Sequence, residues 1–405
     1  MVPVIEASQP LREEDLRQWR LIDSFRQHLG RLGLVMPAGS TWSDPARQLQ
    51  LADYLSLFLF ALVNPVLATT RAVCAASRLE RVQRELCGGS VSLGSFSEAQ
   101  HLTDPAWLEQ LFTQLAAQVP GPAPRDPHQA WQQWFARDGS LLPALPRMHW
   151  ALFGGGKAKK SGAANNAVRL HLSFHLLADK PVAAQVTDGK TCERKTWQAQ
   201  WERGAAYVGD RYYAQDYQCL KELAAAGCAY IVRLCETAVV TVEEELPLTE
   251  ADRAAGVARQ ARVQLGRRPR DRIGPLRVVW VPSATAGELR LATNLPAADA
   301  PAELISVMYR RRWQIEGFFQ WLKCLLGCRH WLAESQRGVT VQLYLALIAA
   351  VLLQLATGRR PTKRMLELIR LYQMGWATLD ELLTGLQREA AHAAARAAKS
   401  KKSKK

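Results

Sequence analysis

The apolar residues change their period near residue 120, and this change limits the chain to a mixed fold. Before that point, apolar residues in three segments between residues 13 and 119 recur at helical spacing, with few strand signals. The run Pro120-Gly-Pro-Ala-Pro124 then favours an extended connection, because proline removes a backbone donor and restricts the residue before it. Beyond it, residues 168–177 alternate as a strand. We therefore predict an α/β protein with a helical domain over residues 1–125.

Short β-type and helical runs then alternate as far as about residue 300. Further β-type runs are expected at 181–186, 206–209, 230–234, 238–242, 276–281 and 289–293, with helices at 192–201 and 217–226. Two more helices are expected at 339–357 and 361–388, before an Ala-Lys-rich tail over 390–405 that we expect to be disordered. This pattern separates a central domain, residues 126–335, from C-terminal helices and the Lys-rich tail, residues 336–405.

Four polar residues of different chemistry stand at steps of three, four and seven residues: Tyr309, Arg312, Glu316 and Lys323. At about 100° per residue, a helix places all four on one side. An apolar stripe runs along the neighbouring side, formed by Met308, Ile315, Phe319, Leu322 and Leu326. The alternative is an ordinary exposed pair of Arg312 and Glu316, which would stabilise a helix by only about 0.2 to 0.5 kcal/mol.

This spacing resembles the signature of the insertion-sequence DDE transposases of the Tyr-Arg-Glu-Lys type, the insertion-sequence-four family. The flanking blocks Leu-Ala-Thr-Asn-Leu-Pro at 291–296 and Leu-Gly-Cys-Arg-His at 326–330 also resemble this family. The resemblance implies a ribonuclease-H-like catalytic core with a β-rich insertion at about residues 235–300. An independent small β domain is the alternative for that insertion.

The family's chemistry is phosphodiester hydrolysis and strand transfer, which needs two divalent cations, Mg²⁺ with Mn²⁺ as a substitute. Two hard cations need several carboxylate oxygens, so Glu316 requires two aspartates upstream. Asp210 is one candidate, because it follows the β-type run 206–209. The family has Asp-Arg-Gly-Tyr there, so Tyr212 replaces a glycine and puts the local turn in question. A solvated aspartate at the start of a loop is the alternative.

Three residues are candidates for the first aspartate: Asp138, Asp179 and Asp188. Asp138 follows an apolar run and opens an Asp-Gly-Ser sequence that resembles the first catalytic strand of the family. Asp188 also precedes glycine, but Asp-Gly is a common turn dipeptide. Asp179 is explained by a hairpin connection. We predict Asp138, Asp210 and Glu316 as catalytic metal ligands, with Asp188 as the alternative to Asp138.

The other signature residues have roles that the resemblance implies. Tyr309, Arg312 and Lys323 would grip phosphate oxygens at the DNA end, Arg as a fork and Lys as a point charge. Trp280 is the candidate for stacking on a flipped base. A tryptophan in a β-type run more often belongs to the core, and this alternative stays open for Trp280.

The charge suits a polyanionic partner. The 405 residues include 52 Lys and Arg against 37 Asp and Glu, which leaves +15 and favours DNA through counterion release. The resemblance implies binding to double-stranded DNA, both the inverted terminal repeats of the element and the target, by a DNA-bound homodimer. We expect the helical domain to read the repeats. The rivals are an inactive transposase-derived repressor and a nonspecific nucleic-acid-binding protein.

Nothing in the sequence indicates a membrane or a structural metal. The eight cysteines lack zinc spacing, and Cys324, Cys328 and His330 lack a fourth ligand. The longest apolar run, residues 55–68, is interrupted by Asn64 and Pro65 and is shorter than the about 20 residues of a membrane span. With no secretory signal at the start, we expect a bacterial cytoplasmic protein that associates with the nucleoid.

Overall fold

The computed structural model describes residues 20–31, 41–121, 133–153, 166–198, 201–268, 271–283, 287–327 and 331–402. The proline-rich connection after Gly121 and the segment with Cys328 and His330 lie outside these ranges.

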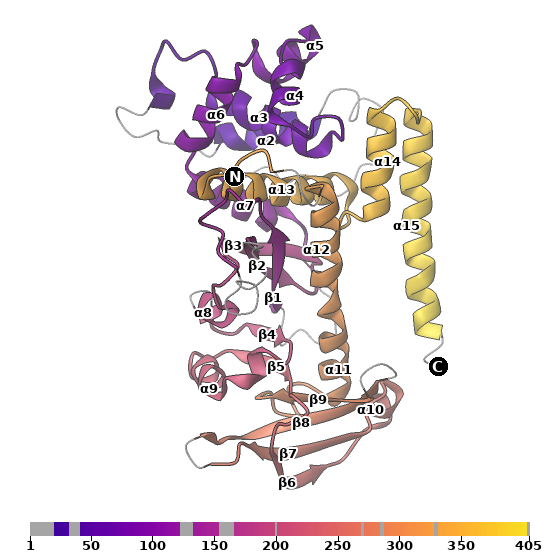
Figure 1. Cartoon of the computed structure of the whole chain (residues 1–405). Coiled ribbons are helices and arrows are strands. Elements are labelled where there is room, and N and C mark those ends of the chain that lie inside the picture. Colours follow the sequence, from indigo (N-terminus) through magenta and orange to yellow (C-terminus); the bar gives the residue numbers. More distant parts are fainter. Residues whose placement is uncertain are drawn as a thin grey trace.

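Short helices make up the N-terminal part and lie together above the sheet (Figure 1). They are α2 (Arg20–Arg31), η1 (Thr41–Ser43), α3 (Leu51–Val63), α4 (Thr70–Ala76), α5 (Glu80–Val82), η2 (Gln83–Cys87), α6 (Leu93–Leu102) and α7 (Pro105–Gln118). Side-chain caps begin several of them: Thr69, Ser92 and Asp104 each accept a hydrogen bond from a backbone N–H in the first turn. The predicted helical character of this region is confirmed.

The strands form one nine-stranded sheet in the order β3-β2-β1-β4-β5-β9-β8-β7-β6. Their bounds are β1 (Trp134–Pro143), β2 (Ala167–His175), β3 (Lys180–Asp188), β4 (Ala206–Gly209), β5 (Ala229–Arg233), β6 (Val240–Leu246), β7 (Arg259–Leu265), β8 (Ile273–Ser283) and β9 (Gly287–Thr293). β1, β4 and β5 pair in parallel, and the other pairs are antiparallel. The α/β prediction is confirmed.

The β-rich segment from β6 to β9 belongs to this same sheet. β9 pairs with β5 through Ile231 and Thr293, so the segment is not an independent β domain. No strand was predicted at β7 (Arg259–Leu265). Its polar residues interrupt the apolar pattern, and pairing with β6 and β8 on both sides supplies the strand instead.

The signature segment forms two helices rather than one, α11 (Ala302–Arg311) and α12 (Trp313–Leu325), which meet at Arg312. The break is small, because Arg312 keeps right-handed helical angles, φ −50° and ψ −34°. Its N–H donates to the Tyr309 carbonyl at 3.2 Å, a tighter three-residue step. The two helices therefore run on as one rod beside the sheet (Figure 1). All five residues of the predicted apolar stripe are buried.

The remaining helices flank the sheet or lie at its ends. They are α8 (Glu193–Gln198), η4 (Tyr213–Gln215), α9 (Tyr217–Ala225), α10 (Glu250–Ala254), α13 (Gln336–Thr357), α14 (Lys363–Gln373) and α15 (Leu379–Lys402). α14 and α15 form a helical hairpin beside α12 (Figure 1). The prediction that the tail over residues 390–405 is disordered is wrong as far as Lys402, because α15 continues to that residue. Alanine, arginine and lysine are good helix formers, which explains the difference.

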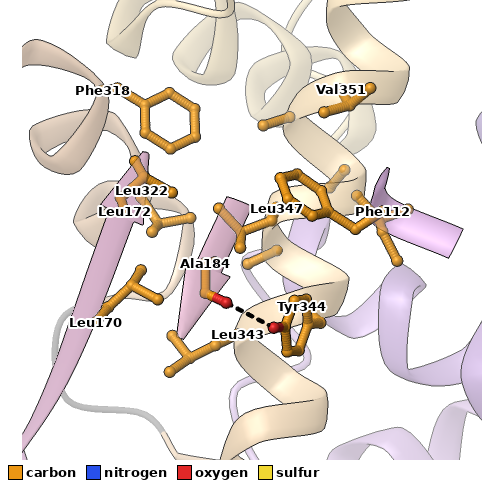
Figure 2. Packing of buried hydrophobic residues seen from close by; sticks show 14 of the residues in the cluster. Phe112, Leu170, Leu172, Ala184, Phe318, Leu322, Leu343, Tyr344, Leu347 and Val351 are labelled. Carbon is orange, nitrogen blue, oxygen red and sulfur yellow. Dashed lines mark hydrogen bonds between the residues drawn. The ribbon is translucent and has the colours of Figure 1, made fainter. Parts of the chain in front are cut away.

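The main core is built around α13. Of the helices that the structure describes, only α13 has the length and hydropathy of a membrane span, and 83% of its apolar window is buried inside the protein. Figure 2 shows Leu343 and Leu347 pointing towards the strands, and the Tyr344 hydroxyl donates to the Ala184 carbonyl at 2.8 Å. The same apolar cluster extends from Phe25 in α2 to the sheet, so the N-terminal helices share this core. α13 is a core helix.

Candidate active site

Two of the predicted carboxylates stand on neighbouring parallel strands. β1 and β4 pair with Ala136 opposite Val208, and two residues further along each strand come Asp138 and Asp210. Neighbouring strands lie about 4.8 Å apart, and equal steps along parallel strands keep side chains on the same face. Asp138 and Asp210 are therefore adjacent at the carboxyl end of the parallel pair, and both are half-buried.

The local sequence explains both positions. β1 is buried from Trp134 to Arg137 and becomes partly exposed at Asp138, where the Gly139 N–H donates to the Asp138 carboxylate at 2.8 Å. β4 is entirely buried and ends directly before Asp210, whose carboxylate accepts from the Tyr212 N–H at 2.8 Å. Both carboxylates thus sit where a buried strand reaches the edge of the core.

The replacement of the family's glycine by Tyr212 does not disturb this turn. Tyr212 has φ −68° and ψ −39°, right-handed helical angles that any L-residue adopts without strain. The backbone conformation requires glycine only where φ is positive. The question that the sequence raised about the turn after Asp210 is therefore answered by the backbone.

Arg312 connects the third carboxylate to the first. One Arg312 guanidinium nitrogen, Nη2, donates to Glu316 Oε1 at 2.6 Å, and Nη1 lies 3.7 Å from Asp138 Oδ2. Arg312 is only 6% exposed, and its Nε has no hydrogen-bond partner within the described residues. The pair of Arg312 and Glu316 is therefore not the ordinary exposed helix pair of the alternative interpretation. It brings α12 to the end of β1.

The electrostatics of Asp138 reflect this crowding. The pKa of Asp138 is raised to about 7, mainly by burial. The Glu193 and Asp210 carboxylates contribute to this rise, whereas Arg312 is the positive group that opposes it. Carboxylate oxygens are the ligands that hard divalent cations such as Mg²⁺ take, so the side chains at this site have the chemistry that such a cation needs.

The present arrangement does not enclose a cation. Across the ranges that the structure describes, no three Asp, Glu, His or Cys side chains lie close enough together to hold a metal ion. Arg312 supplies the positive charge between Asp138 and Glu316.

The remaining predicted residues divide into two groups. Tyr309 is buried beside Arg312, whose guanidinium carbon lies 5.8 Å from the ring centre, and Lys323 is half-buried in the last turn of α12. Trp280 lies in β8 and is only 5% exposed. It packs in a second apolar cluster, separate from the core around α13, and the Arg259 guanidinium lies 4.5 Å from its ring. Tyr309 and Arg312 thus lie beside the carboxylates. Trp280 instead occupies a core position, which was the alternative left open for it.

The two alternative aspartates make contacts typical of turns. Asp188 ends β3 and accepts from the Thr191 N–H at 2.9 Å and the Thr191 hydroxyl at 2.6 Å. Asp179 has a positive φ of 50° in the turn between β2 and β3 and pairs with Arg360 at 3.3 Å. Each aspartate is thereby accounted for by its own turn.

Two residues of this region were missed from the sequence. Trp313 is 62% exposed directly after Arg312, whose guanidinium lies 5.4 Å from its ring, and its place inside the signature could have drawn attention to it. Glu193, in the first turn of α8, affects the pKa of Asp138. No sequence signal marks Glu193, because only the tertiary structure brings α8 to β1.

Comparison with known proteins decides the family. A family model described as "Transposase DDE domain" matches residues 131–352, more than half of the chain. The chain belongs to the DDE transposase family. This match contains Asp138, Asp210 and the signature residues from Tyr309 to Lys323. DDE transposases generally use divalent metal ions.

Individual relatives are named as transposases. The chain is 28% identical over 223 residues to transposase y4zB of Sinorhizobium fredii, covering 54% of this chain and 59% of that protein. It is 40% identical over 78 residues to a protein named as the transposase of insertion sequence element IS5377 from Geobacillus stearothermophilus, 19% of this chain and 20% of that protein. The chain thus spans less than two thirds of these relatives.

One solved structure is also similar, the piggyBac transposase in a synaptic complex with hairpin DNA. The match covers 95% of this chain and 84% of the piggyBac chain, with a TM-score of 0.45 and 10% sequence identity. Likeness at this level supports no statement about this DDE transposase.

Proposed function

We propose that this DDE transposase binds the terminal inverted repeats of its own insertion sequence and cuts and joins DNA through Asp138, Asp210 and Glu316. The observation that carries the proposal is the buried Arg312, which joins Glu316 on α12 to Asp138 on β1, beside Asp210 at the end of β4. Arg312 thereby links carboxylates on α12 and β1, next to the carboxyl end of β4. This convergence favours a reaction site over the degraded site of a repressor.

The three carboxylates would hold two divalent cations, Mg²⁺ with Mn²⁺ as a substitute. When bound, these cations would activate a water or a DNA 3′ hydroxyl and stabilise the leaving oxygen. Arg312 and Lys323 would donate to phosphate oxygens near the cleaved bond, Arg312 as a planar fork and Lys323 as a point charge. Tyr309 packs against the Arg312 guanidinium and would orient it. Trp280 would reach a flipped base only after leaving its buried position.

The proposed organisation follows from the sheet. Strands β3-β2-β1-β4-β5 with α12 would form the ribonuclease-H-like core within residues 126–335, and β6 to β9 the insertion at about residues 235–300. Residues 1–125 would bind the repeats, and residues 336–405 would complete the fold. We further propose the Tyr-Arg-Glu-Lys subtype, a DNA-bound homodimer and association with the bacterial nucleoid, for which the +15 charge is favourable.

The test is cleavage of a labelled duplex that carries the terminal repeat, with Mg²⁺ or Mn²⁺. Wild type should cut only with metal, and Asp138→Ala, Asp210→Ala and Glu316→Ala should bind the repeat without cutting. Asp188→Ala is the matched control and should cut normally, because Asp188 serves its own turn. Loss of cutting in Asp188→Ala but not Asp138→Ala would move the first metal ligand. Binding without cutting by wild type in either metal would favour the repressor.

A further inference from the structure

Each proposed catalytic aspartate has a glycine beside it that another side chain approaches closely. A Cβ added at Gly139 would lie 2.6 Å from Glu193 Oε1, and a Cβ added at Gly209 would lie 3.0 Å from the Tyr213 ring. Neither glycine has a positive φ, so the backbone does not require glycine at these positions. The two glycines instead leave space for Glu193 and Tyr213.

These contacts come from the opposite face of the sheet. Successive side chains of a strand point to opposite faces, so Asp138 and position 139 face different sides. Arg312 contacts Asp138 on one side, and Glu193 of α8 occupies the space at Gly139 on the other. Because residue 139 has no side chain, the Glu193 carboxylate reaches the strand itself. The Glu193 charge contributes to the raised pKa of Asp138. The pKa of Glu193 is itself raised, mainly by burial and also by the Asp210 charge.

Arg169 of β2 holds Glu193 in this place. Arg169 Nη1 pairs with Glu193 Oε1, and both side chains are largely buried, at 18% and 14% exposure. Arg169 also donates through Nη2 to the Gly189 carbonyl at 3.0 Å, which fixes the guanidinium. Glu193 is therefore held by Arg169 against the backbone of Gly139, the residue that follows Asp138.

We propose that Glu193 is a fourth carboxylate of the metal site, which enters through the space at Gly139 while Arg169 retains it in the absence of cations. This inference rests on the proposed function. Each hard divalent cation takes six or more oxygen ligands, so a fourth carboxylate adds oxygens that three cannot supply. The competing interpretation is that the Arg169–Glu193 pair only ties α8 to β2.

The test is Mn²⁺ binding to the full-length protein without DNA, followed by the electron paramagnetic resonance signal of free Mn²⁺. Glu193→Gln keeps the shape and hydrogen-bonding reach of the side chain but removes its charge. It should weaken Mn²⁺ binding roughly tenfold or more, the loss typical of groups that support a metal site. Gly139→Ala should do the same, because the added Cβ would displace the Glu193 carboxylate.

Two further variants separate the possible outcomes. Glu245→Gln is the matched control, because Glu245 pairs with Arg259 in an exposed position on β6 and should leave Mn²⁺ affinity unchanged. Asp210→Asn should abolish tight Mn²⁺ binding. If Asp210→Asn weakens binding while Glu193→Gln only lowers the melting temperature, the inference is overturned and the proposed function stands. If wild type and Asp210→Asn bind Mn²⁺ equally, both the inference and the metal site are overturned.

Discussion

Arg312 contacts two of the three proposed metal ligands. Its guanidinium lies between Asp138 and Glu316 in a largely buried position. Replacing Arg312 by methionine keeps much of the side-chain volume but removes the guanidinium that pairs with the two carboxylates. We expect Arg312→Met to lower the free energy of unfolding by on the order of 1–3 kcal/mol in EDTA, because two half-buried carboxylates lose their positively charged partner.

Urea denaturation of wild type and Arg312→Met measures this difference. Arg259→Met is the control, because the exposed Arg259–Glu245 pair is expected to contribute about 1 kcal/mol or less. Equal losses in the two variants would contradict a special role for Arg312.

Tyr212 offers a second test at the level of one residue. Its backbone is right-handed helical, and its hydroxyl lies 3.3 Å from Cys192 Sγ. Tyr212→Gly restores the residue typical of the family but increases the freedom of the unfolded chain. We expect a loss of roughly 0.5–1 kcal/mol in stability and no gain in DNA cleavage. A clear rise in metal-dependent cleavage would show instead that Tyr212 impairs the turn after Asp210.

At the scale of one element, β2 carries two histidines that the fold keeps neutral. Burial lowers the pKa of His171 and of His175 to about 4, helped by the nearby charge of Arg169 for the first and Lys180 for the second. The unfolded chain takes up protons near pH 6.5, before the folded protein does. The stability that these groups contribute is therefore fully present above pH 6.5 and is lost as the pH falls towards 4.

The expected loss is roughly 1–3 kcal/mol per histidine across this pH range. Thermal denaturation of wild type and His175→Gln at pH 7 and pH 4.5 tests it, and the variant should lose less stability on acidification. His149→Gln, at an exposed position, should behave as wild type. An identical pH dependence in all three proteins would contradict a buried neutral His175.

At the scale of the whole molecule, one buried lysine joins the sheet to the end of an N-terminal helix, in addition to the shared apolar core. Lys180 begins β3, and its ammonium donates to the Ala116 carbonyl at 2.6 Å and the Val119 carbonyl at 2.9 Å, at the end of α7. Lys180→Met would leave those carbonyls without a donor. We expect a loss of about 1–3 kcal/mol in unfolding free energy.

The shared core also predicts how the molecule unfolds. Because one apolar cluster extends from α2 to the sheet, signals from helices and from buried aromatic residues should change together in wild type and in Lys180→Met. Circular dichroism in the far and near ultraviolet measures both. Two separate transitions in wild type would mean that residues 1–125 fold independently of the sheet.

Local interactions explain what could be predicted from the sequence. The run 206–209 was predicted as a strand with the bounds observed for β4, because a short, mainly apolar run between turn residues favours a buried strand. The apolar stripe from Met308 to Leu326 was likewise predicted and is buried. β7 was not predicted, because its pairing with neighbouring strands and not its apolar pattern makes it a strand. The extension of α15 to Lys402 was not predicted either, because helix propensity outweighs the repulsion between its charges.

The sequence by itself determined most of the strands and helices, and which carboxylates carry the family pattern, because periodicity and spacing depend only on neighbours along the chain. The tertiary structure alone decided that β1 and β4 pair with Asp138 beside Asp210, that Arg312 is buried between Asp138 and Glu316, and that Glu193 fills the space at Gly139. Those contacts join residues far apart in sequence. Their geometry follows from strand register and from helix packing across both faces of the sheet, which no local pattern records.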